Sequence, residues 1–299
     1  MRSIAVIAAF IFVSSAAARE KPKLGPDDIG TTDPGKGVNF YSLEKEIALG
    51  RQMAEEVMLT SRLCNDHVVT EYVNRVGQNV ARNSDAKVPL TIQVIDSEEV
   101  NAFALPGGFL FVNTGLVMRA GSEAQLAGVL AHEIAHVAAR HGTKQATRAQ
   151  LVQYAAIPLV MFGGSMGYII YEAATIAVPI EFSRFSRSME TQADHLGIQY
   201  LYKTGYDPGE FIEFFEKVES IEHQEPGTLA RAFSSHPMTN GRIRRAQKEI
   251  EGELQPRSEY VVDTAEFQAV RARLIEIENR RKSYEIYRAP ILRPRPGMQ

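Results

Sequence analysis

The feature that most constrains this chain is an Ala-rich segment, residues 129–142, which contains His132-Glu133-Ile-Ala-His136. Residues i and i+4 of a helix lie on the same face, so His132 and His136 can both bind one metal ion. Glu133 lies about 100° further round the helix, where its carboxylate can take a proton from water beside that ion. The pattern favours a metal site over two exposed histidines on an ordinary helix.

A catalytic zinc ion usually has three protein ligands and one open position, so a third ligand must come from elsewhere. His141 follows His136 by five residues and points away from the shared face. Gly142 stands where another class of zinc proteases carries its third histidine. We therefore expect His141 to be a cation at the end of a helix over residues 123–141, with Gly142 directly after it.

Glu190 and Asp194 are better candidates to complete the site. They are four residues apart in a predicted helix over residues 186–202, and therefore share a face. On their own they would be taken for exposed acids of an amphipathic helix. Beside a two-histidine motif, Glu190 is the expected third ligand, and Asp194 is expected to accept a hydrogen bond from a ligand histidine. His195 projects from another face and is not expected to bind this metal.

The remaining pattern predicts a mainly α chain with a small β-sheet, the α+β class. Thr91–Ile95 alternates as a strand does, and residues 101–114 read as two strand segments joined at Pro106-Gly107-Gly108. The second segment begins at Gly108, Phe109, Leu110 and Phe111. It is either an edge strand that pairs with an extended peptide or an ordinary core strand. Predicted helices occupy residues 42–59, 72–80 and 208–221, the basic segment after Gly241, and the tail from Phe267 to Ile277.

The N-terminus resembles a secretory signal. A basic start, an apolar run over residues 4–13 and small residues up to Ala18 predict export with cleavage before Arg19. An uncleaved membrane anchor is the alternative, although the run is short for a span. We expect a signal peptide at 1–18, a flexible leader at 19–39, the main domain at 40–250, and a helix with a Pro/Arg-rich tail at 251–299. Cys64 is the sole cysteine, is expected to be a buried apolar residue, and excludes an internal disulfide.

Two further properties concern partners. The net charge of −3 gives no reason to expect nucleic acid. Residues 154–180 are the most apolar part of the chain after the signal, but a single membrane crossing there would put His132 and Glu190 on opposite sides. We expect two short helices packed over the site, or a hairpin that contacts a membrane surface.

Four motifs in order carry a family resemblance over residues 40–250: His132-Glu-Ile-Ala-His136, Glu190 with Asp194, Asn101-Ala-Phe-Ala-Leu-Pro-Gly-Gly108, and Ser235-His-Pro237 before Arg242-Ile243. This combination resembles the HtpX-like zinc endopeptidases, metallopeptidase family 48, which also includes the CAAX prenyl proteases. The signal peptide makes the chain most similar to the periplasmic branch. No helical-repeat domain of the kind found in that branch is expected after residue 250.

The resemblance implies a gluzincin-type metallopeptidase domain with an active-site helix and an edge strand. It implies one Zn²⁺ per subunit held by His132, His136 and Glu190, with Glu133 as general base. The implied substrates are misfolded or unassembled envelope proteins in the periplasm, with membrane association as an option.

His236 is left with three roles: a loop histidine, a fourth ligand that closes the site, or a donor to the transition-state oxyanion. The rival functions are a zinc-bound chaperone-like or binding module whose site is rarely active, and a purely structural zinc. A structural zinc usually has four protein ligands, whereas three are expected here beside a free carboxylate.

Overall fold

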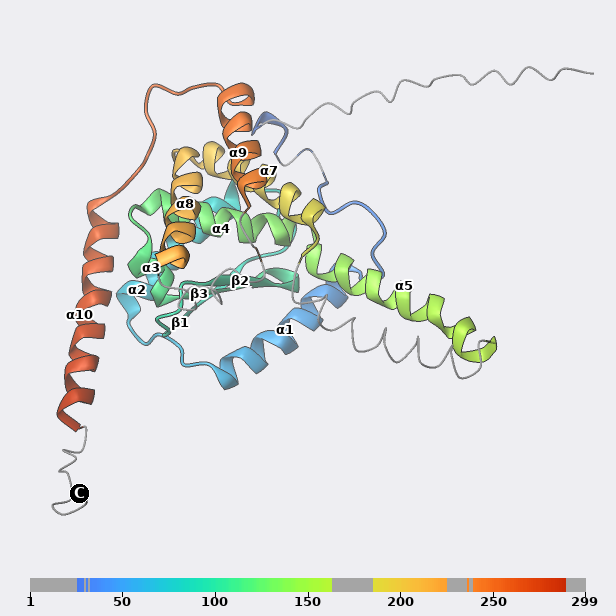
Figure 1. The fold of residues 1–299 in the computed structure, drawn as a ribbon, viewed down its shortest axis with the longest axis horizontal. Coiled ribbons are helices and arrows are strands. Elements are labelled where there is room, and N and C mark those ends of the chain that lie inside the picture. Colours follow the sequence, from blue (N-terminus) through green and yellow to red (C-terminus); the bar gives the residue numbers. More distant parts are fainter. Residues whose placement is uncertain are drawn as a thin grey trace, which may run out of the picture.

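The computed structural model describes residues 26–29, 31, 33–162, 185–224, 236 and 239–288 (Figure 1). It confirms a mainly α-helical chain with one small sheet. The strands are β1 (Thr91–Ile95), β2 (Ala102–Leu105) and β3 (Phe109–Asn113), and two 3-10 turns are η1 (Pro26–Asp28) and η2 (Pro106–Gly108). The helices are α1 (Leu43–Thr60), α2 (His67–Arg82), α3 (Thr114–Arg119), α4 (Glu123–Ala138), α5 (His141–Phe162), α7 (Arg187–Thr204), α8 (Gly209–Gln224), α9 (Asn240–Glu253) and α10 (Ala265–Arg288).

Local capping chemistry sets several helix ends. The side chains of Ser42, Ser122 and Ser186 each accept a hydrogen bond from a backbone N–H in the first turn of α1, α4 and α7. These bonds satisfy donors that a helix N-terminus leaves without partners. Gly205 ends α7 in the left-handed conformation, with a φ of 98°, which glycine adopts without the strain of a side chain.

The sheet order is β1-β3-β2, with β1 parallel and β2 antiparallel to β3. Of the two alternatives for the strand that begins at Gly108, Phe109, Leu110 and Phe111, the edge strand is wrong and the core strand is confirmed, because β3 is the central strand and β2 lies at the edge. The physical reason is that β3 pairs with β1 along one of its edges and with β2 along the other, and its side chains are buried on both faces. Leu110 belongs to the main core and Phe111 to a smaller core cluster that includes Ala54 of α1.

The sheet lies between α1 on one face and α2 with α4 on the other (Figure 1). Phe103 and Phe111 stack on the α1 side, with ring centroids 5.2 Å apart. Ile92, Leu110 and Val112 pack into the main core on the other side. This arrangement puts β2 next to α4, the helix that carries His132 and His136.

Every residue of α4 is buried, so α4 is the central helix of the fold. Its many small side chains let neighbouring helices approach closely. Gly197 of α7 faces the backbone of His132, and a Cβ there would lie only 3.2 Å from His132 Cα. The close crossing of α4 and α7 brings Glu190 and Asp194 across from the two histidines.

The helix from Glu123 ends at Ala138, earlier than expected, and the chain bends before α5 begins at His141. Arg140 has a φ of 56°, an unfavourable conformation for a residue with a side chain. Its guanidinium stabilises the bend, with Nε donating to Glu46 Oε2 at 2.6 Å and Nη2 to Tyr41 O at 2.7 Å. Gly142 therefore lies in the first turn of α5 and does not directly follow the helix that carries His132 and His136.

The last residues of the predicted flexible leader are packed against the domain. Pro34 is buried, and its carbonyl accepts hydrogen bonds from Lys144 Nζ at 3.1 Å and Gln192 Nε2 at 3.3 Å. Residues 33–39, the end of the expected leader, therefore contact α5 and α7 despite their polar composition. At the other end of the chain, Phe267, Val270 and Leu274 of α10 belong to the main core.

The apolar segment 154–180 falls mostly outside the described residues, since α5 is described to Phe162 and the chain resumes at Phe185. Among the described residues, none of the helices combines the length and apolar character that crossing a bilayer requires. Cys64 is partly buried and packs against the main core.

Candidate metal centre

Four buried side chains from three parts of the chain converge at one point: His132 and His136 of α4, Glu190 of α7, and His236. We call them the four-residue cluster. Each offers a ligand atom, and these atoms all lie within 4.8 Å of one another. The Nε2 atoms of His132 and His136 are 3.2 Å apart, and Glu190 oxygens lie 3.5 Å from the first and 3.7 Å from the second. Such a donor set can hold a metal ion.

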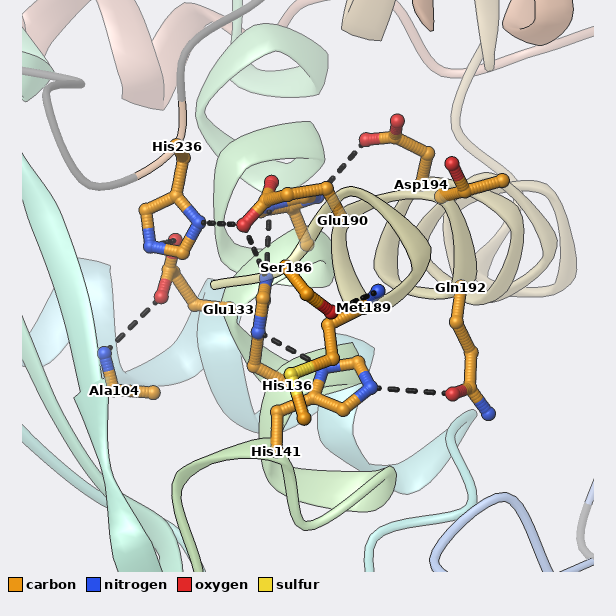
Figure 2. A network of polar contacts seen from close by, with 12 residues as sticks. Ala104, Glu133, His136, His141, Ser186, Met189, Glu190, Gln192, Asp194 and His236 are labelled. Atoms are coloured by element: carbon orange, nitrogen blue, oxygen red, sulfur yellow. Dashed lines mark hydrogen bonds and ion pairs between the residues drawn. The ribbon is translucent and has the colours of Figure 1, made fainter. Parts of the chain in front are cut away.

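The two histidines of α4 turn their Nε2 atoms inward and their Nδ1 atoms outward. His132 Nδ1 lies 3.3 Å from Asp194 Oδ1. His136 Nδ1 lies 3.0 Å from His141 Nδ1, and His141 Nε2 lies 3.2 Å from Gln192 Oε1 (Figure 2). Metal-binding histidines are usually oriented by such a partner on the other ring nitrogen. The arrangement therefore matches a metal centre in its supporting contacts as well as in its donors.

His141 is not the helix-end cation that the sequence suggested. It is buried, and that burial lowers its pKa to about 4, so the ring is neutral. The bend at Arg140 turns its ring back toward His136. His141 thus contacts a candidate ligand without being one itself.

Arg242 of α9 is a buried residue of the site to which the sequence analysis gave no role. Its Nε and Nη2 donate to the two oxygens of Asp194 at 2.8 and 2.6 Å, and its Nη1 lies 2.9 Å from Glu190 Oε2. Nη1 also donates to the carbonyl of His236 at 3.2 Å. One guanidinium therefore contacts both acids of α7 and the segment that carries His236. The only signal in the sequence was its place in a motif, since a buried arginine cannot be told from an exposed one in a basic helix.

Glu133 lies beside the four-residue cluster and points toward the sheet. Its Oε2 accepts a hydrogen bond from the backbone N–H of Ala104 at 3.1 Å, and its Oε1 lies 3.8 Å from His236 Nε2 (Figure 2). The Ala104 N–H is therefore turned away from β3 and toward the site. This contact places the free edge of β2 against the candidate base.

Burial and neighbouring charges adjust the pKa values in the site. Burial raises the pKa of Glu133, which makes it a stronger base than an exposed carboxylate. Burial also works against a charged His132, but contacts with Asp194 and Glu190 outweigh it and raise its pKa to about 9. For Glu190, burial is outweighed by contacts with His132 and His236, which lower its pKa, so it is an anionic donor.

Not every candidate lies in the cluster. His195 contacts Glu249 of α9 instead, as its different face on α7 predicted. Leu110 and Phe111 pack into the two cores on either side of the sheet. His236, whose role the sequence left open, is buried in the cluster, with its Nδ1 2.8 Å from Glu190 Oε1.

Comparison with known proteins identifies the group of proteins that shares this arrangement. The model of peptidase family M48 matches residues 68–250, a range that contains α4, α7, the whole four-residue cluster and Arg242. The chain belongs to peptidase family M48. This confirms the resemblance drawn from the four motifs, and members of this family are metal-dependent peptidases.

Curated relatives within M48 cover most of this chain. It is 32% identical over 224 residues to the putative beta-barrel assembly-enhancing protease of Vibrio cholerae, covering 72% of this chain and 45% of the relative. It is 28% identical over 271 residues to the beta-barrel assembly-enhancing protease of Escherichia coli K12, covering 84% and 53%. The mitochondrial metalloendopeptidase OMA1 of Schizosaccharomyces pombe is 32% identical over 217 residues, covering 70% and 62%. The chain spans about half the length of the first two relatives.

Proposed function

We propose that this chain is a zinc-dependent endopeptidase. In this proposal His132, His136 and Glu190 hold one Zn²⁺ per subunit, Glu133 is the general base, and Asp194 orients His132. The observation that carries the proposal is the convergence of the buried cluster directly beside Glu133. Membership of family M48 supports the same reaction class.

Zinc fits the donors better than a hard cation does. Imidazole nitrogens and a carboxylate are common zinc ligands, and two ligands of a tetrahedral zinc ion lie about 3.3 Å apart. The separations of 3.2, 3.5 and 3.7 Å among His132, His136 and Glu190 are close to that value. Glu190 Oε2 is also buried and lies 2.9 Å from Arg242 Nη1, whose positive charge compensates part of the charge of the carboxylate.

When bound, zinc supplies positive charge that polarises the scissile carbonyl and lowers the pKa of water in the site. Glu133 takes a proton from the attacking water while the water oxygen bonds to the carbonyl carbon. The C–N bond then breaks, and Glu133 returns the proton to the leaving amine. The Ala104 N–H holds the Glu133 carboxylate in place for both transfers.

The edge strand β2 is the proposed binding surface for substrate. An extended peptide can pair with its free backbone groups, and such pairing depends little on which side chains the peptide carries. This suits a protease that acts on many unfolded chains. Together with the predicted signal peptide at residues 1–18 and the similarity to beta-barrel assembly-enhancing proteases, this supports misfolded or unassembled envelope proteins as substrates and the periplasm as location.

His236 supports a second candidate function. Its ring is buried with the three proposed ligands, and its Nδ1 lies 2.8 Å from Glu190 Oε1. We propose that His236 is a fourth ligand that closes the site at rest and leaves it to admit substrate. If it stayed in place permanently, the chain would be a zinc-bound chaperone-like module with little turnover.

Contact with a membrane surface through residues 154–180 remains part of the proposal. Leu151, Val152 and Tyr154 near its start are exposed on α5. Exposed apolar side chains favour insertion between lipid headgroups. High salt should then leave the protein on membranes, whereas detergent should release it.

The decisive experiment is digestion of an unfolded protein such as casein, with and without a chelator. We expect hydrolysis that stops on chelation and returns with zinc. Glu133→Gln should keep the zinc but lose hydrolysis by about 10²-fold or more, since the general base is removed. Full turnover by this variant would overturn the assignment of Glu133, and a zinc-loaded wild-type protein without turnover would favour the chaperone-like module.

A further inference from the structure

A second group of metal-ligating side chains lies between α7 and α9, away from the four-residue cluster. It comprises His195 of α7 with Glu249 and Glu253 of α9, and we call it the α7–α9 cluster. One ligand atom of each residue lies within 4.8 Å of the other two. The proposed peptidase mechanism does not use these residues.

Helix geometry builds this cluster. Glu249 and Glu253 are four residues apart, so both project from the same face of α9. His195 follows Asp194 directly and projects about 100° away from it, out of the metal centre and toward α9. His195 Nδ1 lies 2.8 Å from Glu249 Oε1, which brings the two helices within reach of one ion.

The exposure of the cluster suits a site filled from solution. The side chains of His195 and Glu249 are 25% and 13% exposed, and Glu253 is at the surface. A hydrated ion can therefore reach the site, while two of its ligands are already partly dehydrated and held in position. The two side chains therefore lose less bound water and less conformational freedom when the ion binds.

Gln199 provides an independent observation at the inner side of the cluster. Its Nε2 donates to Glu249 Oε1 at 2.9 Å, while its Oε1 is buried and accepts no hydrogen bond within the described residues. Rotation of the Gln199 side-chain amide by half a turn exchanges the positions of Nε2 and Oε1. With a cation present, the oxygen of Gln199 can face the ion and Glu249 no longer needs the amide donor.

We propose that the α7–α9 cluster binds a divalent transition-metal ion, with Zn²⁺ as the best-fitting ion because one imidazole and two carboxylates are typical zinc ligands. The ion would join α7 to α9 beside the contact between Asp194 and Arg242. Its role is to hold α9, and with it the Arg242 guanidinium, against Glu190 and Asp194 of α7. The site goes beyond the proposed peptidase activity and does not depend on it.

The test measures zinc per chain in the full-length protein after equilibrium dialysis against increasing zinc. We expect a second zinc ion per chain in the wild type. Glu253→Gln and His195→Gln should weaken its binding by about tenfold or more, since loss of even an outer partner of a metal site costs that much. Glu251→Gln removes the same charge from the opposite side of α9 and should keep the second ion.

The two metal sites are separated by a further variant. His136→Ala should lose the zinc ion of the four-residue cluster. It should keep the ion of the α7–α9 cluster, which Glu253→Gln removes. A ligand that binds only the folded state raises the melting temperature. Added zinc should therefore raise the Tm of His136→Ala but not that of His136→Ala combined with Glu253→Gln. Equal zinc content in Glu253→Gln and Glu251→Gln, or a single zinc ion in the wild type, would overturn the proposal.

Discussion

Arg242 and Asp194 lie on different helices and form a two-pronged ion pair in the protein interior, with N–O distances of 2.8 and 2.6 Å. The same guanidinium contacts Glu190 and the carbonyl of His236. Because Asp194 in turn lies against His132, the pair links α9 to three of the residues proposed to surround the zinc. Precise placement of donors determines metal affinity, so this contact is a sensitive point for mutation.

Arg242→Lys keeps the positive charge but cannot form the two parallel hydrogen bonds, since an ammonium group lacks the planar fork. We expect zinc affinity to fall by about 10- to 100-fold, as measured by competition with a chromophoric chelator. Arg244→Lys is the matched control, because Arg244 is an exposed neighbour on the same helix. Equal affinities in the two variants would show that Arg242 does not position the ligands.

His236→Ala distinguishes the roles of a buried histidine that touches both Glu190 and Glu133. If His236 closes the site as a fourth ligand, its removal frees a position for substrate and hydrolysis should rise. We expect an increase of about tenfold in rate, which corresponds to a barrier about 1.4 kcal/mol lower once His236 no longer competes with substrate for the metal. The measurement is the initial rate of casein digestion at equal zinc content. Loss of activity would instead assign His236 the role of a donor to the oxyanion.

His141→Ala removes the contact 3.0 Å from His136 Nδ1. The imidazole of His136 would then be less well oriented, and we expect zinc affinity to fall by about 10-fold or more. His67→Ala provides the control, because His67 is exposed on α2. If chelator competition gives the same affinity for both variants, His141 does no more than fill space.

Arg140→Ala tests the bend that brings His141 back toward the site. Glu46 is buried and its Oε2 accepts from Arg140 Nε at 2.6 Å, so the mutation leaves a carboxylate in the interior without its cation. Breaking a buried pair in this way costs about 3–5 kcal/mol. Urea denaturation should show that loss, while Arg148→Ala, at an exposed position on α5, should stay close to wild type. A loss in Arg140→Ala no larger than in this control would argue against the ion pair.

Much of the fold was predictable because its signals are local. Serine caps at Ser42 and Ser186, the alternation of Thr91–Ile95 and the glycine after Thr204 depend on interactions within a few residues. The same is true of His132, Glu133 and His136, whose spacing on one helix turn predicts their relation in space. The prediction of Glu190, 54 residues after His136, needed chemistry as well, because a catalytic metal site with two histidines needs a third protein ligand.

Other features depend on contacts that no local pattern contains. The position of β3 at the centre of the sheet depends on the pairing of β1 and β2 along its two edges. In sequence, a strand paired on both edges looks the same as an edge strand of similar composition. The early end of α4 depends on Glu46, which lies 94 residues from Arg140 in the chain. That distant ion pair outweighed the local preference for a helix running on to Gly142.

The sequence by itself therefore determined the metal-binding chemistry, the family and most of the helices and strands, because each follows from residue types at short spacing. Only the tertiary structure decided which buried groups support that chemistry. Arg242, His141, the Ala104 N–H and the cluster of His195 with Glu249 come from segments far apart in the chain. Their proximity results from the close packing of α4, α7 and α9, which is a property of the folded core and not of any single segment.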